Sequence, residues 1–261
     1  MKDPASTRRF APILTSTGLS LLMTGGALAA VAVAFSACSG LGAMVVWGAM
    51  ASYLLLSAVV LATVTQHHPF LTFGLANAVT NLRAAVAALL TGVLAAMMHA
   101  PGHGIEAPAP MLTGDPLVAL VVAVAVALLF DGVDGRLARS RGISSVFGAR
   151  FDMEVDAYTI LCLCLLLVGI GKLGPWVLAI GLMRYLFVLA GWWMPWLMQP
   201  LPPSRRRQAV CVLQYVALLV ALLPPVTPFA GAVVVAISLG SLIWSFAVDI
   251  LDLAGRRTAA A

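Results

Sequence analysis

Charge is what this chain lacks most. Only 10% of its 261 residues are charged, whereas 62% are hydrophobic. A soluble domain carries about 25% charged residues, because its surface has to be solvated. The shortage of charge therefore excludes a soluble enzyme, and the abundance of hydrophobic residues excludes a disordered chain. The composition is that of an integral membrane protein.

Cysteine is also scarce, since the chain contains only four. So few cysteines, all in apolar surroundings, exclude a secreted domain held together by disulfides. Cys162 and Cys164 are too close together, and too apolar in context, to indicate a zinc site. We interpret all four as lipid-facing or packing residues: Cys38, Cys162, Cys164 and Cys211.

Long polar segments are missing as well, and the longest polar connection is residues 99–115. A membrane-spanning helix requires about 20 apolar residues. Unbroken apolar runs such as 117–130 exclude transmembrane β-strands, in which polar and apolar residues alternate. We predict an all-α fold, a polytopic transmembrane helix bundle of about eight spans. The predicted spans are 12–37, 41–64, 70–98, 115–138, 145–170, 174–198, 208–224 and 228–252.

The first span has a second interpretation. Basic residues followed by an apolar run that ends at Phe35–Cys38 resemble a secretion signal with a lipoprotein-type cysteine. The run is much longer than the usual signal core of roughly 7–15 residues. We therefore expect the first span to be retained.

The basic residues predict the orientation of the chain. Its formal net charge is +5, and in a membrane protein such a charge reflects basic cytoplasmic loops rather than nucleic-acid binding. With eight spans, only Lys172 falls in the loops of the opposite side. We therefore expect both termini and the active site to face the cytoplasm, in a bacterial inner membrane. The basic residues of the cytoplasmic side are Lys2, Arg8, Arg9, Arg136, Arg139, Arg141, Arg150, Arg205, Arg206, Arg207, Arg256 and Arg257.

Acidic residues are rare but concentrated, because five of the ten lie within residues 131–156. Asp131 and Asp134 are three residues apart, so they share one helical face, and the spacing of four does the same for Asp152 and Asp156. A helix hairpin between the two pairs brings four carboxylates together at the cytoplasmic end. Four like charges require a strong counter-charge. Hard oxygen ligands favour magnesium, manganese or calcium, and two divalent ions roughly 4 Å apart suit displacement at phosphorus.

Two glycines and an arginine accompany these carboxylates. Gly135 and Gly148 each lie one turn from an aspartate, where the missing Cβ lets a ligand approach the backbone. Close packing of helices is the alternative interpretation of both glycines. Arg139 suits a phosphate, or it serves only as a basic residue of the cytoplasmic side.

The combined spacing is more specific than its parts. It reads D-x2-D-G-x2-A-R-x8-G-x3-D-x3-D with every fixed position occupied. Eight fixed positions, at typical usage of roughly 5–10% each, make a chance match negligible. The pattern resembles the signature of the CDP-alcohol phosphotransferase family, also called CDP-alcohol phosphatidyltransferases. The resemblance covers residues 70–252 and implies a six-helix core in 67–261, preceded in 1–66 by a basic segment and two additional spans.

The resemblance also implies an activity and a set of roles. Family members transfer a substituted phosphate from a CDP-linked donor to an alcohol and release CMP. The family pattern implies two divalent cations, Mg²⁺ or Mn²⁺, and a homodimer. By the same pattern Asp156 has two roles, as a metal ligand and as the general base that takes the proton of the acceptor hydroxyl. The implied metal ligands are Asp131, Asp134, Asp152 and Asp156, and the implied nucleotide-lining residues are Gly135, Ala138, Arg139 and Gly148.

A second family element lies earlier in the chain. Residues 77–83 match the pattern N-x-x-T-x-x-R, which lines Asn77, Thr80 and Arg83 along one helical face. We expect this stripe, with Asn77 and Thr80 as nucleotide-binding residues, to contact the diphosphate or cytosine of the donor. Hydrogen bonding between helices is the alternative. Many members have proline before the asparagine, whereas this chain has Ala76, which leaves the start of the helix open.

Four further arginines suit an acceptor phosphate. Arg184 interrupts an otherwise apolar span, where an arginine is costly unless it has a function. Arg205, Arg206 and Arg207 are expected to assist it, because arginine binds phosphate with two parallel hydrogen bonds. Attraction to anionic membrane lipids is the alternative for this triplet.

These observations predict an enzyme of phospholipid synthesis. It transfers a phosphatidyl group from CDP-diacylglycerol to a polar alcohol, and the arginines favour glycerol 3-phosphate or another phosphorylated acceptor. Inositol phosphate, serine and choline stay open as acceptors. One alternative is the reverse arrangement, in which a CDP-alcohol such as CDP-choline donates to diacylglycerol. Another is a divalent-cation transporter, which broken helices and inverted repeats would favour.

Overall fold

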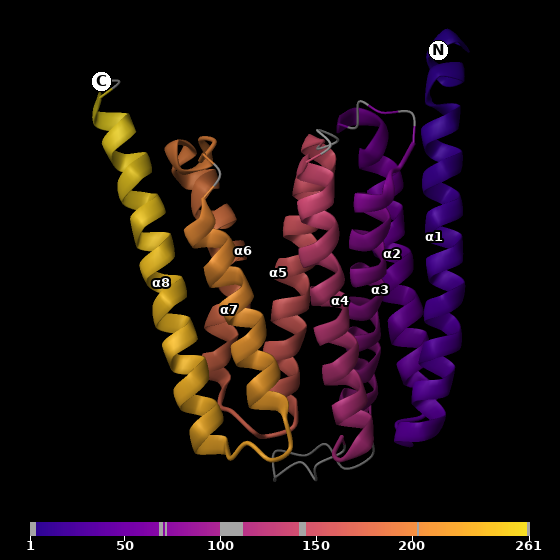
Figure 1. Cartoon of the computed structure of the whole chain (residues 1–261), viewed down its shortest axis with the longest axis vertical. Coiled ribbons are helices and arrows are strands. Elements are labelled where there is room, and N and C mark those ends of the chain that lie inside the picture. Colours follow the sequence, from indigo (N-terminus) through magenta and orange to yellow (C-terminus); the bar gives the residue numbers. More distant parts are fainter. Residues whose placement is uncertain are drawn as a thin grey trace. The chain divides into compact units, whose positions relative to one another are not determined.

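A computed structural model describes residues 4–67, 70, 72–99, 112–140, 145–202 and 204–259 of the chain, and within them the side chains of 12–65, 70, 72–99, 112–130, 145–202 and 204–256. Throughout these residues the ordered structure is helical and contains no strand (Figure 1). The predicted all-α class is confirmed.

The chain divides into two compact units, Met1–Thr159 and Ile160–Ala261. The first contains α1 (Pro4–Ser39), α2 (Met44–His67), α3 (Leu75–His99), α4 (Asp115–Ser140) and the beginning of α5 (Val146–Gly169). The second contains the end of α5, then η1 (Pro175–Val177), α6 (Leu178–Trp193), η2 (Pro195–Met198), α7 (Arg205–Leu222) and α8 (Pro228–Ala259).

The start of α3 is set by a glycine. Gly74 adopts φ = 79°, in the left-handed region that favours glycine. Its carbonyl accepts a hydrogen bond from the backbone N–H of Ala78 at 3.1 Å, which closes the first helical turn. The helix therefore begins at Leu75 without the proline that many family members carry before Asn77.

α3 is the central helix of the first unit. Of its apolar segment 61% is buried, compared with 22% for α1 and 28% for α2. It packs against α1, α2 and α4. A Cβ atom on Gly92 would lie 2.8 Å from the backbone nitrogen of Ala49 and would also collide with the carbonyl of Val45. The backbones of α2 and α3 therefore touch, as small residues permit in membrane proteins.

Polar side chains join α1 and α2 to α3 and α5. The amide nitrogen of Asn81 on α3 donates to the hydroxyl of Thr24 on α1 at 3.0 Å, and its amide oxygen accepts from Tyr53 on α2 at 3.0 Å. The hydroxyl of Tyr158 on α5 lies 2.8 Å from that of Ser52 and also hydrogen bonds to Thr91. Buried polar groups need such partners, so these contacts fix which faces of α1, α2, α3 and α5 meet. We call them the polar clasp of the first unit.

In the second unit, α7 and α8 pack side by side. The Gln214 amide donates to the Ser238 carbonyl at 2.9 Å and accepts from the Ser238 hydroxyl at 2.5 Å. The ammonium of Lys172 donates to the carbonyl of Leu223 at 2.6 Å, which links the loop after α5 to the end of α7. These contacts hold the second unit together.

Five helical segments are long and apolar enough to cross a membrane: 12–39, 44–65, 75–99, 175–193 and 228–256. A shorter apolar stretch covers 115–130. α5 and α7 are not among these segments because charged residues lie near their N-terminal ends, including Arg150 and Asp152 in the first half of α5 and Arg205–Arg207 in the first turn of α7. The chain is an integral membrane protein; the count of eight spans and their orientation stay predictions.

Candidate functional site

Two polar stripes face each other within the first unit. On α3 the stripe consists of Asn77, Thr80 and Arg83, all buried. On α5 it consists of Gly148, Asp152 and Asp156, spaced four residues apart and therefore aligned along one face. Because Asn77 lies against Gly148 while Arg83 reaches both aspartates, the two helices run in the same direction.

The first contact of the stripes is between Asn77 and Gly148. A Cβ atom on Gly148 would lie 2.7 Å from Oδ1 of Asn77 and 3.2 Å from Oγ of Ser145. Asn77 is held by a hydrogen bond from its amide nitrogen to the carbonyl of Phe73 at 2.5 Å. Ser145 accepts from the backbone N–H of Gly148 at 2.9 Å, which caps the start of α5. The absence of a side chain at Gly148 thus makes room for the amide of Asn77.

The second contact is an arginine bound to two carboxylates. Nη1 of Arg83 lies 2.5 Å from Oδ1 of Asp152, and Nη2 pairs with Oδ1 of Asp156. The side chain of Arg83 is only 4% exposed, whereas Asp152 is 41% and Asp156 21% exposed. The planar guanidinium carries donors in a fork, which suits two oxygen acceptors at once. The guanidinium is therefore buried, whereas the two carboxylates are partly exposed.

Thr80 lies between these contacts. Its hydroxyl donates to the carbonyl of Ala76, one turn earlier on its own helix, at 3.1 Å. It is 5% exposed. The structure thus brings together five residues that the sequence predicts to bind nucleotide or metal. Two of them lie on α3 and three on α5: Asn77, Thr80, Gly148, Asp152 and Asp156.

What sequence reasoning missed are the partners of Arg83, whose contacts with α5 are the hydrogen bonding between helices given as the alternative for this stripe. The pattern N-x-x-T-x-x-R places Arg83 on the stripe, but it was not predicted to bind the aspartates. The signal was available, because like charges packed together require a positive partner. What sequence does not reveal is the register between two helices whose contact joins residues 69 positions apart.

The remaining predicted ligands and nucleotide residues lie on α4. The helix continues through them, but their side chains lie outside those that the structure describes, so the predicted convergence of four carboxylates is not tested. Among the described side chains, no group of three or more possible metal ligands comes together. Asp152 and Asp156 do supply the carboxylate oxygens that hard divalent cations prefer, so the donor set fits such an ion. The residues on α4 are Asp131, Asp134, Gly135, Ala138 and Arg139.

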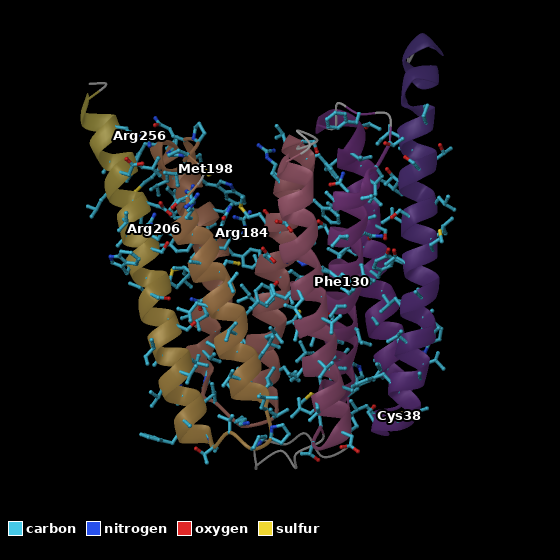
Figure 2. All side chains as sticks on the ribbon, viewed as in Figure 1. Cys38, Phe130, Arg184, Met198, Arg206 and Arg256 are labelled. Atoms are coloured by element: carbon cyan, nitrogen blue, oxygen red, sulfur yellow. The ribbon has the colours of Figure 1, made fainter. Side chains whose placement is uncertain are left out.

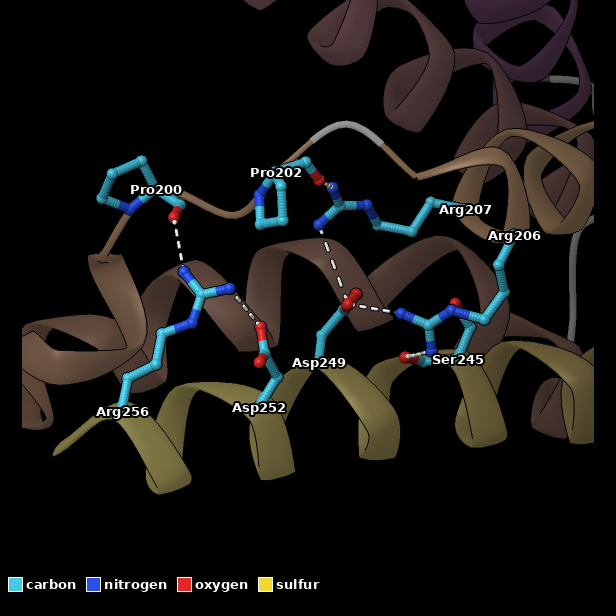
Figure 3. Close-up of polar contacts among 8 residues, drawn as sticks. All are labelled: Pro200, Pro202, Arg206, Arg207, Ser245, Asp249, Asp252 and Arg256. Carbon is cyan, nitrogen blue, oxygen red and sulfur yellow. Dashed lines mark hydrogen bonds and ion pairs between the residues drawn. The ribbon is translucent and has the colours of Figure 1, made fainter. Parts of the chain in front are cut away.

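The predicted acceptor residues lie in the second unit, where an aspartate on α8 engages two of them (Figure 3). Nη2 of Arg206 lies 2.5 Å from Oδ1 of Asp249, and Nη1 of Arg207 lies 3.7 Å from the same oxygen. Arg206 also donates to the carbonyl of Ser245 at 2.7 Å and lies 5.6 Å from the ring centre of Trp244. These contacts tie the start of α7 to α8.

Other arginines of the second unit differ in their surroundings. Arg256 on α8 pairs with Asp252 one turn earlier at 2.7 Å. Arg205 is exposed, whereas Arg184 is half-buried partway along α6 (Figure 2). The acceptor-binding roles of Arg184, Arg205, Arg206 and Arg207 stay predictions.

One family model matches the chain. It is that of CDP-alcohol phosphatidyltransferases, and it covers residues 73–244. The match contains both polar stripes and begins just before α3, so that α1 and α2 lie outside it. No curated protein and no solved structure matches the chain. The resemblance predicted from the aspartate pattern is confirmed.

Proposed function

Because the chain belongs to the CDP-alcohol phosphatidyltransferase family, we propose that it transfers a phosphatidyl group from CDP-diacylglycerol to a polar alcohol. CMP is the other product. The observation that carries the proposal is the pair of facing stripes, which join Asn77 to Gly148 and Arg83 to Asp152 and Asp156 within the matched region. An amide at one end suits a nucleotide, and the carboxylates at the other end would hold the divalent cations that neutralise its diphosphate.

Asp152 and Asp156, with Asp131 and Asp134 of α4, are the residues that would hold two divalent cations, Mg²⁺ or Mn²⁺. When bound, such cations neutralise the diphosphate and stabilise the departing CMP. Carboxylates are suited to this role because their oxygens are hard ligands.

Asp156 is the proposed general base. Its carboxylate takes the proton of the acceptor hydroxyl, and the hydroxyl oxygen then attacks the phosphorus that bears diacylglycerol. The bond from that phosphorus to the CMP oxygen breaks, so that CMP leaves and the phosphatidyl alcohol forms. A base has to be within hydrogen-bonding reach of the proton that it takes, and the partial exposure of Asp156 supports access by the acceptor.

The nucleotide is proposed to lie along the first half of the stripes. Asn77 and Thr80 of α3 and Gly148 of α5 line this part, and Gly135, Ala138 and Arg139 of α4 join them by the family pattern. Gly148 supports the proposal because its missing side chain lets the buried amide of Asn77 lie against the start of α5 in this part of the stripes. The diacylglycerol of the donor enters from the cytoplasmic leaflet, and we expect a homodimer.

Arg184 is proposed to bind a phosphate of the acceptor, which favours glycerol 3-phosphate or a similar alcohol. Arg184→Ala should raise the acceptor KM about tenfold to a hundredfold, because it removes a charged hydrogen bond of about 1.5–3 kcal/mol. The donor KM should change little. An equal rise of both constants would contradict the assignment, and steady-state kinetics on purified protein distinguishes the two results.

The activity itself is tested by incubating purified protein with radiolabelled CDP-diacylglycerol, a divalent cation and a panel of alcohols. We expect CMP release and a new phospholipid with one acceptor, and neither product when the cation is chelated. CMP release only from a CDP-alcohol with diacylglycerol would show that the donor is assigned wrongly. Release of no CMP under any combination would refute the proposed function.

A further inference from the structure

Arg83 is a cation in a place where a cation is costly. Its side chain is 4% exposed, and it lies on the helix that is most deeply packed in the first unit. A buried charge persists only when it is paired and hydrogen bonded. Two nitrogens of its guanidinium bind two different carboxylates, those of Asp152 and Asp156. The arginine and the two aspartates therefore form one unit of charge, and we call it the Arg83 bridge.

The arginine in turn stabilises the arrangement of the two aspartates. They lie one turn apart on α5, and their Oδ1 atoms both turn toward the same guanidinium. Two carboxylates that converge without a positive group repel each other. An arginine between them offsets the repulsion and keeps both oxygens on the same side of the helix.

The same arginine opposes a divalent cation. A metal ion that binds Asp152 and Asp156 shares them with a positive charge that already occupies one oxygen of each. Two cations that share the same carboxylates repel each other, and the burial of Arg83 reduces the screening of its charge by water. The Arg83 bridge therefore orders the two carboxylates and at the same time weakens their hold on a metal.

We propose that Arg83 is a positioning residue that serves as a built-in counter-cation: it holds Asp152 and Asp156 together in the metal-free protein and competes with divalent cations for them. The inference rests on the proposed function for its meaning, because those aspartates are the proposed metal ligands. It is tested by metal binding, which does not depend on turnover.

The experiment measures Mn²⁺ binding by electron paramagnetic resonance on purified, metal-free full-length protein. Arg83→Gln removes the charge and should tighten Mn²⁺ binding about tenfold or more. It should also lower the temperature of thermal unfolding without metal, and added Mn²⁺ should raise that temperature more than in the unaltered protein. The matched control is Arg256→Gln, which removes an arginine from an aspartate pair on α8 and should leave Mn²⁺ affinity unchanged.

An Arg83→Gln protein that unfolds cooperatively but binds Mn²⁺ with equal or lower affinity would overturn the inference. Should this variant fail to fold, Arg83→Lys decides. Lysine keeps the charge but has no fork to engage two carboxylates, which frees an oxygen of one of them. Mn²⁺ should then bind more tightly than in the unaltered protein, although less tightly than without the charge, and an unchanged or lower affinity overturns the inference. Tighter Mn²⁺ binding by the Arg83 variants, together with no CMP release by the unaltered protein, would support the bridge while refuting the transferase activity. CMP release by the unaltered protein, together with unaltered Mn²⁺ affinity in the variants, would support the transferase activity while refuting the bridge.

Discussion

Asp156 combines two proposed roles, ligand and base, that one substitution separates. Asp156→Asn keeps the size of the side chain and an oxygen for coordination, but it does not take a proton. We expect the variant to bind CDP-diacylglycerol with metal and to lose transfer by a factor of about 10² or more. Donor binding and single-turnover transfer are measured on the same sample.

The control for this variant is Glu154→Gln, an exposed carboxylate on the same helix that is not a position of the pattern. It should transfer at a nearly normal rate. Persistent transfer by Asp156→Asn would assign the base to another group. Loss of donor binding would instead make Asp156 chiefly a metal ligand.

Gly148 offers a steric test of the nucleotide site. An alanine there places its Cβ 2.7 Å from Oδ1 of Asn77, so the buried amide has to move. Gly148→Ala should therefore raise the donor KM about tenfold while the acceptor KM stays nearly constant, in line with one disrupted polar contact of about 1–3 kcal/mol. Gly240→Ala on α8 is the control, since a Cβ there meets nothing within 4 Å. Equal donor KM values for the two variants would argue against a nucleotide beside Gly148.

At this scale the sequence predicted well what depends on local spacing. Gly148, Asp152 and Asp156 lie on one face because intervals of four suffice to align them on any helix. The partner of the aspartates was not predictable in the same way. The Arg83 bridge depends on how α3 and α5 pack against each other, and no local pattern encodes that register.

Among the elements, the contact between α2 and α3 is the most sensitive to added volume. Gly92→Ala introduces a Cβ that would lie 2.8 Å from the nitrogen of Ala49 and would collide with the carbonyl of Val45, both backbone atoms that cannot turn aside. Overpacking of this kind typically costs about 1–3 kcal/mol. We expect a clearly lower unfolding temperature in detergent and reduced transfer.

Gly26→Ala on α1 is the matched control, because a Cβ at that position meets nothing within 4 Å. It should unfold at the same temperature as the unaltered chain or slightly above, since alanine favours helix over glycine. Equal unfolding temperatures for Gly92→Ala and Gly26→Ala would show that α2 and α3 are not in backbone contact.

The helix boundaries show where reading apolar runs succeeds and where it does not. The prediction of one span over 174–198 corresponds to α6 with a short 3₁₀-helix on each side, and each of these short helices begins at a proline, Pro175 or Pro195. The span predicted over 208–224 begins earlier, at Arg205, since a helix includes charged turns that a search for apolar residues leaves out. The apolar pattern identifies the middle of a helix better than its ends.

For the whole molecule, the predicted orientation is testable with a native cysteine. Cys38 is exposed near the end of α1 (Figure 2), whereas Cys162 and Cys164 are buried and Cys211 is half-buried. If the N-terminus is cytoplasmic, the first span carries Cys38 to the opposite face. A membrane-impermeant maleimide should then label intact cells at Cys38, and Cys38→Ser should abolish that labelling. Labelling of Cys38 only after the membrane is permeabilised would contradict the orientation.

The polar clasp has a consequence for how the protein is made. Helices emerge from the ribosome in order, so α1 and α2 are already in the membrane when α3 follows them. We therefore expect Asn81 to pair with Thr24 and Tyr53 before Arg83 pairs with Asp152, which is synthesised 69 residues later. An arginine at the centre of an inserting helix costs about 2.5–3.5 kcal/mol, which is an upper value for Arg83 in the first half of α3. The two helices that precede the family region would thus stabilise the inserted α3 by hydrogen bonds during biogenesis, before the aspartates of α5 are synthesised.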